Sequence, residues 1–417
     1  MTPIQAPEVE YALIAPILIV SGGAVLGTLV EAFVSRKHRF GLQAVVAFAT
    51  VVAALADSIY VYVHLDRVAG VGRGQISTEG ALAVDGPGVL TWAMLSVFAL
   101  LSFALFAERR LEGGLSAFTG RAADPPGSPG EVEARAARLE HAEIFPLAMF
   151  ALLGMMVFAT ANDLLTLFVA LEVLSLPLYV MCGLARRRRL LSQEAALKYF
   201  LLGAFSSAFF AYGIALAYGY AGGVRLSDIA SAVEKGAVAT NTDGRALLLA
   251  AIGLMSVGLL FKIGAVPFHA WTPDVYQGAP TPVTAFMAAG TKAAAVVALM
   301  RVLFVAFGGA SWDWRPLILA VSVVTMLLGS LVAIAQTDGK RMLGYSSVAH
   351  AGFLLVGIAG AFAAAGRISS VSAVLFYLAV YGVASIGAFG VVMLVRDSSA
   401  HGGGEANYLA RWAGLGQ

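Results

Sequence analysis

The sequence is poor in charged residues and in cysteine, and each shortage excludes a class of protein. Only 12% of its residues are charged, whereas 59% are hydrophobic, and its mean hydropathy is +0.83. Ordinary globular chains are closer to a quarter charged and half apolar, so the composition argues against a soluble multidomain protein. Cys182 is the only cysteine. It has no second thiol for an internal disulfide, and there is no cysteine cluster for zinc or iron–sulfur ligation.

Several other features are also missing. No Gly-rich nucleotide motif lies between an expected strand and helix. The net charge of +2 is too small to indicate nucleic-acid binding, and short strands alternating in polarity, as in membrane barrels, are not seen. Any electron-transfer cofactor of a redox system would therefore belong to another chain.

The sequence does have repeated apolar runs of about 20 residues, which is the length needed to cross a bilayer as a helix. We predict an all-α, polytopic transmembrane bundle of about eleven spans. The predicted spans are 11–34, 42–65, 87–107, 143–160, 163–184, 192–219, 246–266, 281–307, 315–335, 342–363 and 371–395. The N-terminus carries Glu8 and Glu10 instead of the basic region of a cleavable signal, and Arg36–Arg39 follow the first run as a stop-transfer flank.

Basic residues in the loops predict the orientation. With the N-terminus outside, more of the loop Lys and Arg residues fall on the inner side, as the positive-inside rule requires. The inner loops would hold Arg36, Lys37, Arg39, Arg109, Arg110, Arg121, Arg135, Arg138, Arg186–Arg189, Lys340, Arg341, Arg396 and Arg411. The outer loops would hold Arg67, Arg73, Arg225, Lys235, Arg245, Arg315 and Arg367.

We interpret 108–142 as a solvated connector, in which an irregular Pro/Gly segment precedes a short surface helix at 131–140.

Four ionisable side chains within the spans are the main functional candidates. They are Glu172, Lys198, Lys262 and Lys292. Each charge at mid-membrane costs about 2.5–3.5 kcal/mol on insertion scales, which favours a functional role over decoration. The alternative is a buried ion pair that only locks helices together. Lysine, unlike arginine, loses its proton when desolvated, so these positions favour proton transfer.

Two expectations concern how these groups are arranged. The short turn between the fifth and sixth spans makes Glu172 and Lys198 facing neighbours, so we predict that they pair and that a tight pair keeps Lys262 protonated. Gly264 and Pro267 predict a helix broken near Lys262–His269, with its freed backbone lining a cavity or an ion path. His269 and His350 are either further proton relays or ordinary core residues.

Several motifs resemble one known family. They are residues 162–165 (NDLL), 172–179 (EVLSLPLY), 195–200 (AALKYF), 266–283 (VPFHAWTPDVYQGAPTPV) and 340–350 (KRMLGYSSVAH). These runs resemble the antiporter-like membrane subunits of respiratory complex I. The run at 266–283 is similar to that of bacterial subunit N, equivalent to mitochondrial subunit 2. The matched region spans about 143–396, and the first three spans match only in number and placement.

The resemblance implies a proton-translocating subunit in the membrane arm of NADH:quinone oxidoreductase, in the bacterial inner membrane. It implies inverted repeats and gives Glu172, Lys198, Lys262 and Lys292 roles in proton translocation. It also implies no cofactor in this chain, because NADH and quinone bind other subunits. Other membrane-arm subunits and the lipid bilayer are the expected partners, without nucleic acid.

One departure from the family concerns chain length. Members of this type have further spans, including a second broken helix with a lysine. We therefore expect residues 1–142 to form three helices plus a cytoplasmic linker, and 143–417 to form a translocation domain truncated before the last three helices. The alternative functions are a subunit of a multisubunit cation/proton antiporter and a membrane scaffold without transport.

Overall fold

The structure is a computed structural model that describes most of the chain. The described residues are 9–65, 67–68, 72–125, 127–236, 242–361, 370–397 and 404–415. Among the residues used above for orientation and signal assignment, Glu8 and Arg367 lie outside these ranges, and no side chain is described for Arg67, Arg73 or Arg135.

Long apolar helices dominate the described residues. The spanning elements are α1 (Tyr11–Phe33), α2 (Arg36–His64), α3 (Gly86–Phe106), α5 (Ile144–Thr160), α6 (Leu164–Cys182), α7 (Arg189–Ala221), α9 (Thr242–Ile263), α11 (Thr281–Arg301), α12 (Ser311–Ile334), α13 (Gly339–Ala359) and α14 (Val371–Leu394). Ten helical segments within the described residues are long and apolar enough to cross a membrane, and α5 is a shorter apolar helix. Each predicted span has a helix, so the prediction of an all-α polytopic bundle is confirmed.

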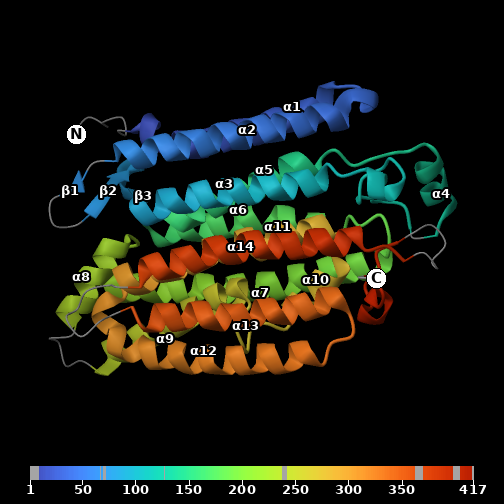
Figure 1. Cartoon of the computed structure of the whole chain (residues 1–417). Helices are drawn as coiled ribbons and strands as arrows, with labels where there is room; N and C mark the ends of the chain where they lie inside the picture. The colour runs from blue at the N-terminus through green and yellow to red at the C-terminus, as the bar shows by residue number, and fades with distance from the viewer. Residues whose placement is uncertain are drawn as a thin grey trace.

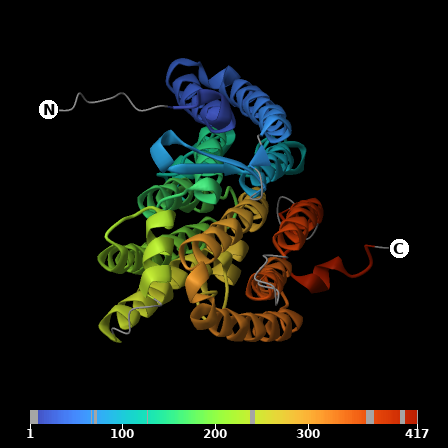
Figure 2. The ribbon, with the colours of Figure 1, turned by 90° about the vertical axis from the view of Figure 1, so that its left-hand side faces the viewer.

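The helices form one bundle with their axes roughly along one direction (Figure 1). The pair α1 and α2 lies at one edge and α12 at the opposite edge, as the end-on view also shows (Figure 2). The central helix is α11, whose residues Thr281–Arg301 are all buried. It packs against α3, α5, α9 and α14, and Lys292 is therefore surrounded by protein on every side.

Short elements close the two ends of the bundle. The helix α8 (Leu226–Gly236) and a small sheet lie at one end, called here the α8 end (Figure 1). The helix α4 (Pro129–Ala136) and the described C-terminal segment lie at the other, the α4 end. The prediction of a short surface helix in the 108–142 connector is confirmed, although α4 begins and ends earlier than 131–140.

The small sheet was not predicted from the sequence. Strands β1 (Arg67–Val68), β2 (Gly72–Ser77) and β3 (Leu82–Asp85) pair antiparallel in the order β1-β2-β3 between α2 and α3. Such short strands carry little alternation, so no pattern marked them. The sheet ends at Asp85, which caps α3 by accepting a hydrogen bond from the Gly88 amide and forms a 2.9 Å ion pair with Arg301.

A close helix contact brings the centre of α6 against α5. The Gly154 backbone lies so near Leu174 that an added Cβ would overlap Leu174 backbone atoms. Small residues allow such approach between membrane helices, where packing replaces the hydrophobic effect as the force for association. This contact fixes the position of α6 at Leu174, which lies two residues after Glu172.

Candidate functional site

The ninth helix is broken, as predicted, and its freed backbone groups are satisfied inside the protein. The helix α9 ends at Ile263, and α10 (Trp271–Gly278) begins after a turn. Gly264 has φ +80°, and both its amide and that of Ala265 donate to the Leu260 carbonyl. The Val266 amide donates to the Thr325 hydroxyl of α12 at 3.1 Å.

The indole of Trp271 bridges the break. Its Nε1–H donates to the Phe261 carbonyl at 2.9 Å, so the first residue of α10 is bound to the last turn of α9. Its ring also stacks on Tyr199 of α7, with centroids 4.7 Å apart and an interplanar angle of 14°. The sequence predicted the break but not α10, because a Pro-rich segment favoured a plain connection.

Lys262 lies just before the break and is 3% exposed. Its ammonium has no hydrogen-bond partner among the described residues. Instead it faces two aromatic rings, with Nζ 5.4 Å from the ring centroid of Tyr179 and 5.2 Å from that of Tyr199. Rings within about 6 Å of a desolvated cation contribute on the order of 2 kcal/mol. We call Tyr179 and Tyr199 the tyrosine cage.

Glu172 is the acidic neighbour of this cage. One of its carboxylate oxygens, Oε1, is buried and has no hydrogen-bond partner among the described residues. The carboxylate interacts electrostatically with Lys262 and with Tyr179. Glu172 and Lys262 therefore belong to one electrostatic unit, although they form no direct ion pair within the described residues.

The predicted direct pair of Glu172 with Lys198 is wrong for this structure. The Lys198 ammonium instead forms ion pairs with Glu194 at 2.7 Å and Asp274 at 2.8 Å. Glu194 precedes Lys198 by one helical turn, where side chains share a face. Asp274 lies on α10, which packs against α7. Because α10 was not expected, no sequence signal marked Asp274 as a competing partner.

Asp274 joins Lys198 to α13. Arg341 donates to the other Asp274 carboxylate oxygen at 2.6 Å. Burial raises the pKa of the Asp274 carboxyl, but the hydrogen bonds from Lys198 and Arg341 outweigh burial and lower it. A cavity of about 130 Å³ is lined by Glu194, Lys198, Asp274, Gln277 and Arg341 at the α4 end. Water in such a polar cavity would reach Lys198.

Lys292 occupies the centre of the bundle on α11 and is 3% exposed. Its ammonium donates to the Ser347 carbonyl and, at 2.7 Å, to the Ser347 hydroxyl of α13. It also lies 5.1 Å from the centroid of the Tyr381 ring on α14. The Tyr276 hydroxyl on α10 is 3.5 Å from the same Ser347 hydroxyl. A polar connection therefore joins Lys292 to the helix that follows the break.

The two candidate histidines differ in placement. The ring of His350 is 4.8 Å from that of Tyr381 and interacts electrostatically with Lys292. Its Nδ1 forms a hydrogen bond with the Tyr377 hydroxyl. His269 lies in the break, with an Nδ1 that is buried and has no partner among the described residues. The structure brings His350 to Lys292, whereas the centroid of the His269 ring lies 6.4 Å from that of Tyr345.

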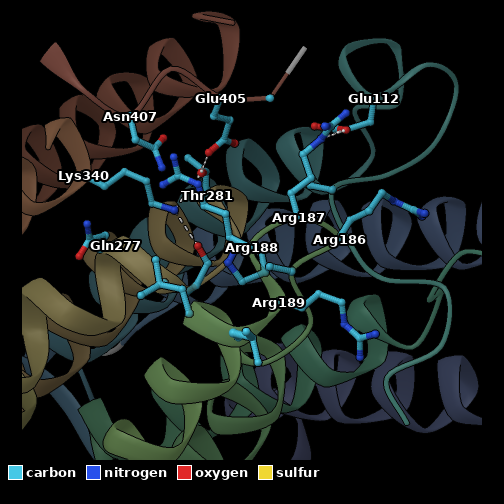
Figure 3. Close-up of a pocket in the computed structure, with 18 of the residues that line it drawn as sticks. Glu112, Arg186, Arg187, Arg188, Arg189, Gln277, Thr281, Lys340, Glu405 and Asn407 are labelled. Carbon is cyan, nitrogen blue, oxygen red and sulfur yellow. Dashed lines mark hydrogen bonds and ion pairs between the residues drawn. The ribbon is translucent and has the colours of Figure 1, made fainter. Parts of the chain in front are cut away.

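A larger polar cavity of about 660 Å³ opens at the α4 end. Figure 3 shows Lys340 and Arg187 on opposite sides of it. The buried Lys340 ammonium donates to the Ala279 carbonyl at 2.7 Å and the Thr281 hydroxyl at 3.2 Å, and Thr281 in turn donates to Glu405 at 2.7 Å. Arg187 pairs with Glu112 at 2.8 Å. These contacts engage Lys340, Glu405, Arg187 and Glu112 among the charged residues that line the cavity.

The described part of the chain contains no group of three or more His, Cys, Asp or Glu side chains that would hold a metal ion.

A bundle of spanning helices, a discontinuous helix and buried lysines on neighbouring elements together define an antiporter-like membrane protein. The family described as "NADH:quinone oxidoreductase/Mrp antiporter, TM" matches residues 161–415. The chain belongs to this family.

Comparisons over 99% of this chain assign it, within the family, to NADH-quinone oxidoreductase subunit N. The chain is 58% identical to NADH-quinone oxidoreductase subunit N of Nocardioides sp., over 99% of this chain and 76% of that protein. It is 53% identical to the subunit N of Acidothermus cellulolyticus, over 99% of this chain and 75% of that protein. A chain of respiratory complex I from Thermus thermophilus with bound aureothin matches with a TM-score of 0.66 and 32% identity, over 91% of this chain and 70% of that one.

The structure of an Mrp complex from Dietzia sp. DQ12-45-1b is also similar. Its chain matches with a TM-score of 0.70 at 22% identity, over 91% of this chain and 64% of that one. At this identity the likeness shows a shared fold alone.

The break itself generates a testable prediction. We expect Gly264→Ala to destabilise the folded state by about 1–2 kcal/mol, because φ +80° disfavours a residue with a Cβ. The added Cβ would also lie 2.9 Å from the Thr272 hydroxyl oxygen. Thermal unfolding of the purified complex measures the effect. Gly253→Ala on the same helix is the control, since nothing lies within 4 Å of its Cβ position. Equal unfolding temperatures for the two variants would contradict the prediction.

Proposed function

We propose that this chain is a membrane-arm subunit of NADH:quinone oxidoreductase and moves protons through its buried lysines. It lies in a bacterial plasma membrane with its N-terminus outside, among other membrane-arm subunits and lipid. NADH and quinone bind other subunits, so this chain holds no redox cofactor and contributes to the enzyme as a translocase. The relatives named above, all bacterial, and the similar chain of complex I support this proposal.

The observation that carries the proposal is the environment of Lys262. Among the described residues this buried ammonium has no hydrogen-bond acceptor, and it lies over two ring faces in the field of Glu172. Its charge is costly in a low-dielectric interior, so small changes nearby decide whether it keeps its proton. An arginine ion pair that merely joined helices would have no such dependence.

Lys198 is the group that supplies this change. While Asp274 and Glu194 hold Lys198, the charge of Glu172 is not neutralised by it and stabilises protonated Lys262. A move of Lys198 toward Glu172 would neutralise that carboxylate and favour release of the proton. This direction is the reverse of the one expected from the sequence, because Glu172 acts on Lys262 directly. Lys198 keeps its role in the proposed site, and Asp274 is its alternative partner to Glu172.

Lys292 takes up the proton that Lys262 releases. The connection runs along α10, where Tyr276 reaches Ser347 and Ser347 accepts hydrogen bonds from Lys292. His350 lies beyond Lys292 and is the candidate for the next acceptor, with Tyr377 as its hydrogen-bond partner. His269 is a candidate intermediate within the break. Water molecules along this polar line would complete the transfer.

A subunit of a cation/proton antiporter complex is the second candidate, favoured only by the fold it shares with the Mrp complex. The two candidates differ in their partners. Affinity purification of the chain from its own membranes recovers peripheral iron–sulfur subunits under the first and none under the second. The division of the chain at residue 142 stays a prediction under either.

Replacing Lys262 by Met tests the proposed proton path. Met keeps much of the side-chain length and removes the charge. We expect proton pumping and quinone reduction both to fall on the order of tenfold or more, because loss of a positioned proton-transfer group typically costs about 10²–10⁴-fold in rate. The measurement is pumping by the assembled complex in membrane vesicles. Lys235→Met in α8 is the control. Normal pumping by the Lys262→Met variant would show that this lysine has a structural role and does not carry protons.

Replacing Asp274 by Asn tests the switch. Without this carboxylate Lys198 loses its 2.8 Å partner on α10 and spends more time near Glu172. We expect pumping to fall about tenfold, which corresponds to a barrier change of about 1.4 kcal/mol, with the assembled complex intact. The matched control is Asp313→Asn, which removes a 2.8 Å ion pair with Arg245. Equal pumping by the two variants would show that Asp274 has no role in the proposed switch.

Orientation is tested by labelling with a membrane-impermeant maleimide in intact cells. The only native cysteine, Cys182, is buried and gives a low background. We expect Lys235→Cys to react, because the α8 end faces outside, and His38→Cys to react only after the membrane is opened. The opposite pattern would place the N-terminus inside. Equal labelling of both variants in intact cells would show that the membrane is leaky. Deliberately opened membranes show how strongly each variant is labelled in that case.

A further inference from the structure

A second cavity at the α4 end lies away from the proposed proton path. It has a volume of about 610 Å³, within the range of about 300–1,000 Å³ usual for ligand sites. Its walls come from the last turn of α1, the first turn of α2, the residue Arg109 after α3, the pair Gly120–Arg121 before α4, and the segment that leads from α4 into α5. Five parts of the chain therefore meet around one space at the end of the first helices.

The walls of this cavity are strongly basic. Six lining residues are Arg or Lys, namely Arg36, Lys37, Arg39, Arg109, Arg121 and Arg138, against the three acids Glu31, Glu140 and Glu143. The acidic partners are partly used already, since Arg39 pairs with Glu31 and Arg109 with Glu140, each at 2.6 Å. The cavity as a whole therefore attracts anions.

Three of the basic side chains lack a counter-ion. Arg36, Lys37 and Arg138 are exposed and form no ion pair with any other described residue. They come from two separate segments, α2 and the stretch that follows α4. An anion in the cavity would therefore interact favourably with basic side chains that no acidic side chain neutralises.

The start of α2 adds to the positive potential. Its first turn contains Arg36, Lys37 and His38 and no acidic residue, and its N-cap residue Ser35 makes no side-chain capping hydrogen bond. A helix N-terminus already carries a partial positive charge, so basic residues there fail to complement the dipole. A bound anion would satisfy both the dipole and the side chains.

We propose that this cavity binds the phosphate headgroup of an anionic phospholipid. The neighbouring turns of α1 and α2 favour a lipid over a free anion. They expose Leu29 (49%) and Phe33 (84%), which flank the lining residue Glu31 on α1, and Val45 (65%), which follows the lining residue Gly41 on α2. The acyl chains lie against these apolar side chains while the headgroup enters the cavity. A basic pocket at the cytoplasmic ends of membrane helices is the usual setting for such recognition.

The bound lipid links separate parts of the chain. The headgroup contacts the start of α2 and Arg138, and so ties the 108–142 connector to the first two helices. Because the interaction is between exposed charges, it weakens as salt increases.

Lipid retention by the intact complex tests this inference. The complex is incorporated into phosphatidylcholine nanodiscs that contain a small fraction of phosphatidylglycerol, re-extracted with detergent, and its retained lipid is identified by native mass spectrometry. We expect the Arg36→Gln/Lys37→Gln variant to retain phosphatidylglycerol about 25-fold more weakly, from about fivefold for each basic residue near an anionic surface. Arg36→Lys keeps the charge and should retain it normally.

The control variant Lys235→Gln/Arg245→Gln removes the same charge at the α8 end and should retain phosphatidylglycerol as the unaltered complex does. Equal retention by the two double variants would overturn the proposal. So would displacement of the lipid by inorganic phosphate alone, which would identify a soluble anion as the ligand. If the Arg36→Gln/Lys37→Gln variant does not assemble, the salt dependence of retention by the unaltered complex decides, and retention unchanged between low and high salt contradicts the inference.

Discussion

A membrane interior has no water to satisfy a free backbone amide, and this constraint governs the centre of the structure. The break after Ile263 is possible only because protein groups replace the missing helical partners. Thr325 accepts from the Val266 amide, and the Trp271 indole donates to the Phe261 carbonyl. These contacts bind the break to α12 on one side and to the tyrosine cage on the other. Lys262 is thereby held at a fixed depth, beside a segment of backbone that is not helical.

The lysines and carboxylates in this interior compete for partners. Glu172 has no direct cation within the described residues, while Lys198 has two carboxylates. Such an imbalance costs free energy in a low dielectric, and it is reduced when one lysine changes partner. In the proposed mechanism, the position of this single flexible side chain distinguishes two states of the site. Lysine suits this role because its compact ammonium rotates on a long stem.

The sequence predicted the spans, the central charges and the break, because each leaves a local mark. Apolar runs of spanning length and Pro267 after Gly264 are visible without any contact map. The partners of these groups are not visible in this way. Asp274 and Tyr276 lie on a short helix inside a Pro-rich segment, and Tyr199 looks like one more aromatic residue on an apolar helix. Their roles depend on how α7, α10 and α13 pack together, which neither periodicity nor spacing encodes.

The Trp271 ring has a mechanical consequence. It is stacked on one wall of the cage, hydrogen-bonded to the turn that carries Lys262, and lies three residues before Asp274 on α10. A tilt of α10 large enough to separate Asp274 from Lys198 therefore also pulls on Tyr199 and on the backbone beneath Lys262. Such a tilt would change both the electric field at Lys262 and the shape of the space around it, because one indole is bound to both.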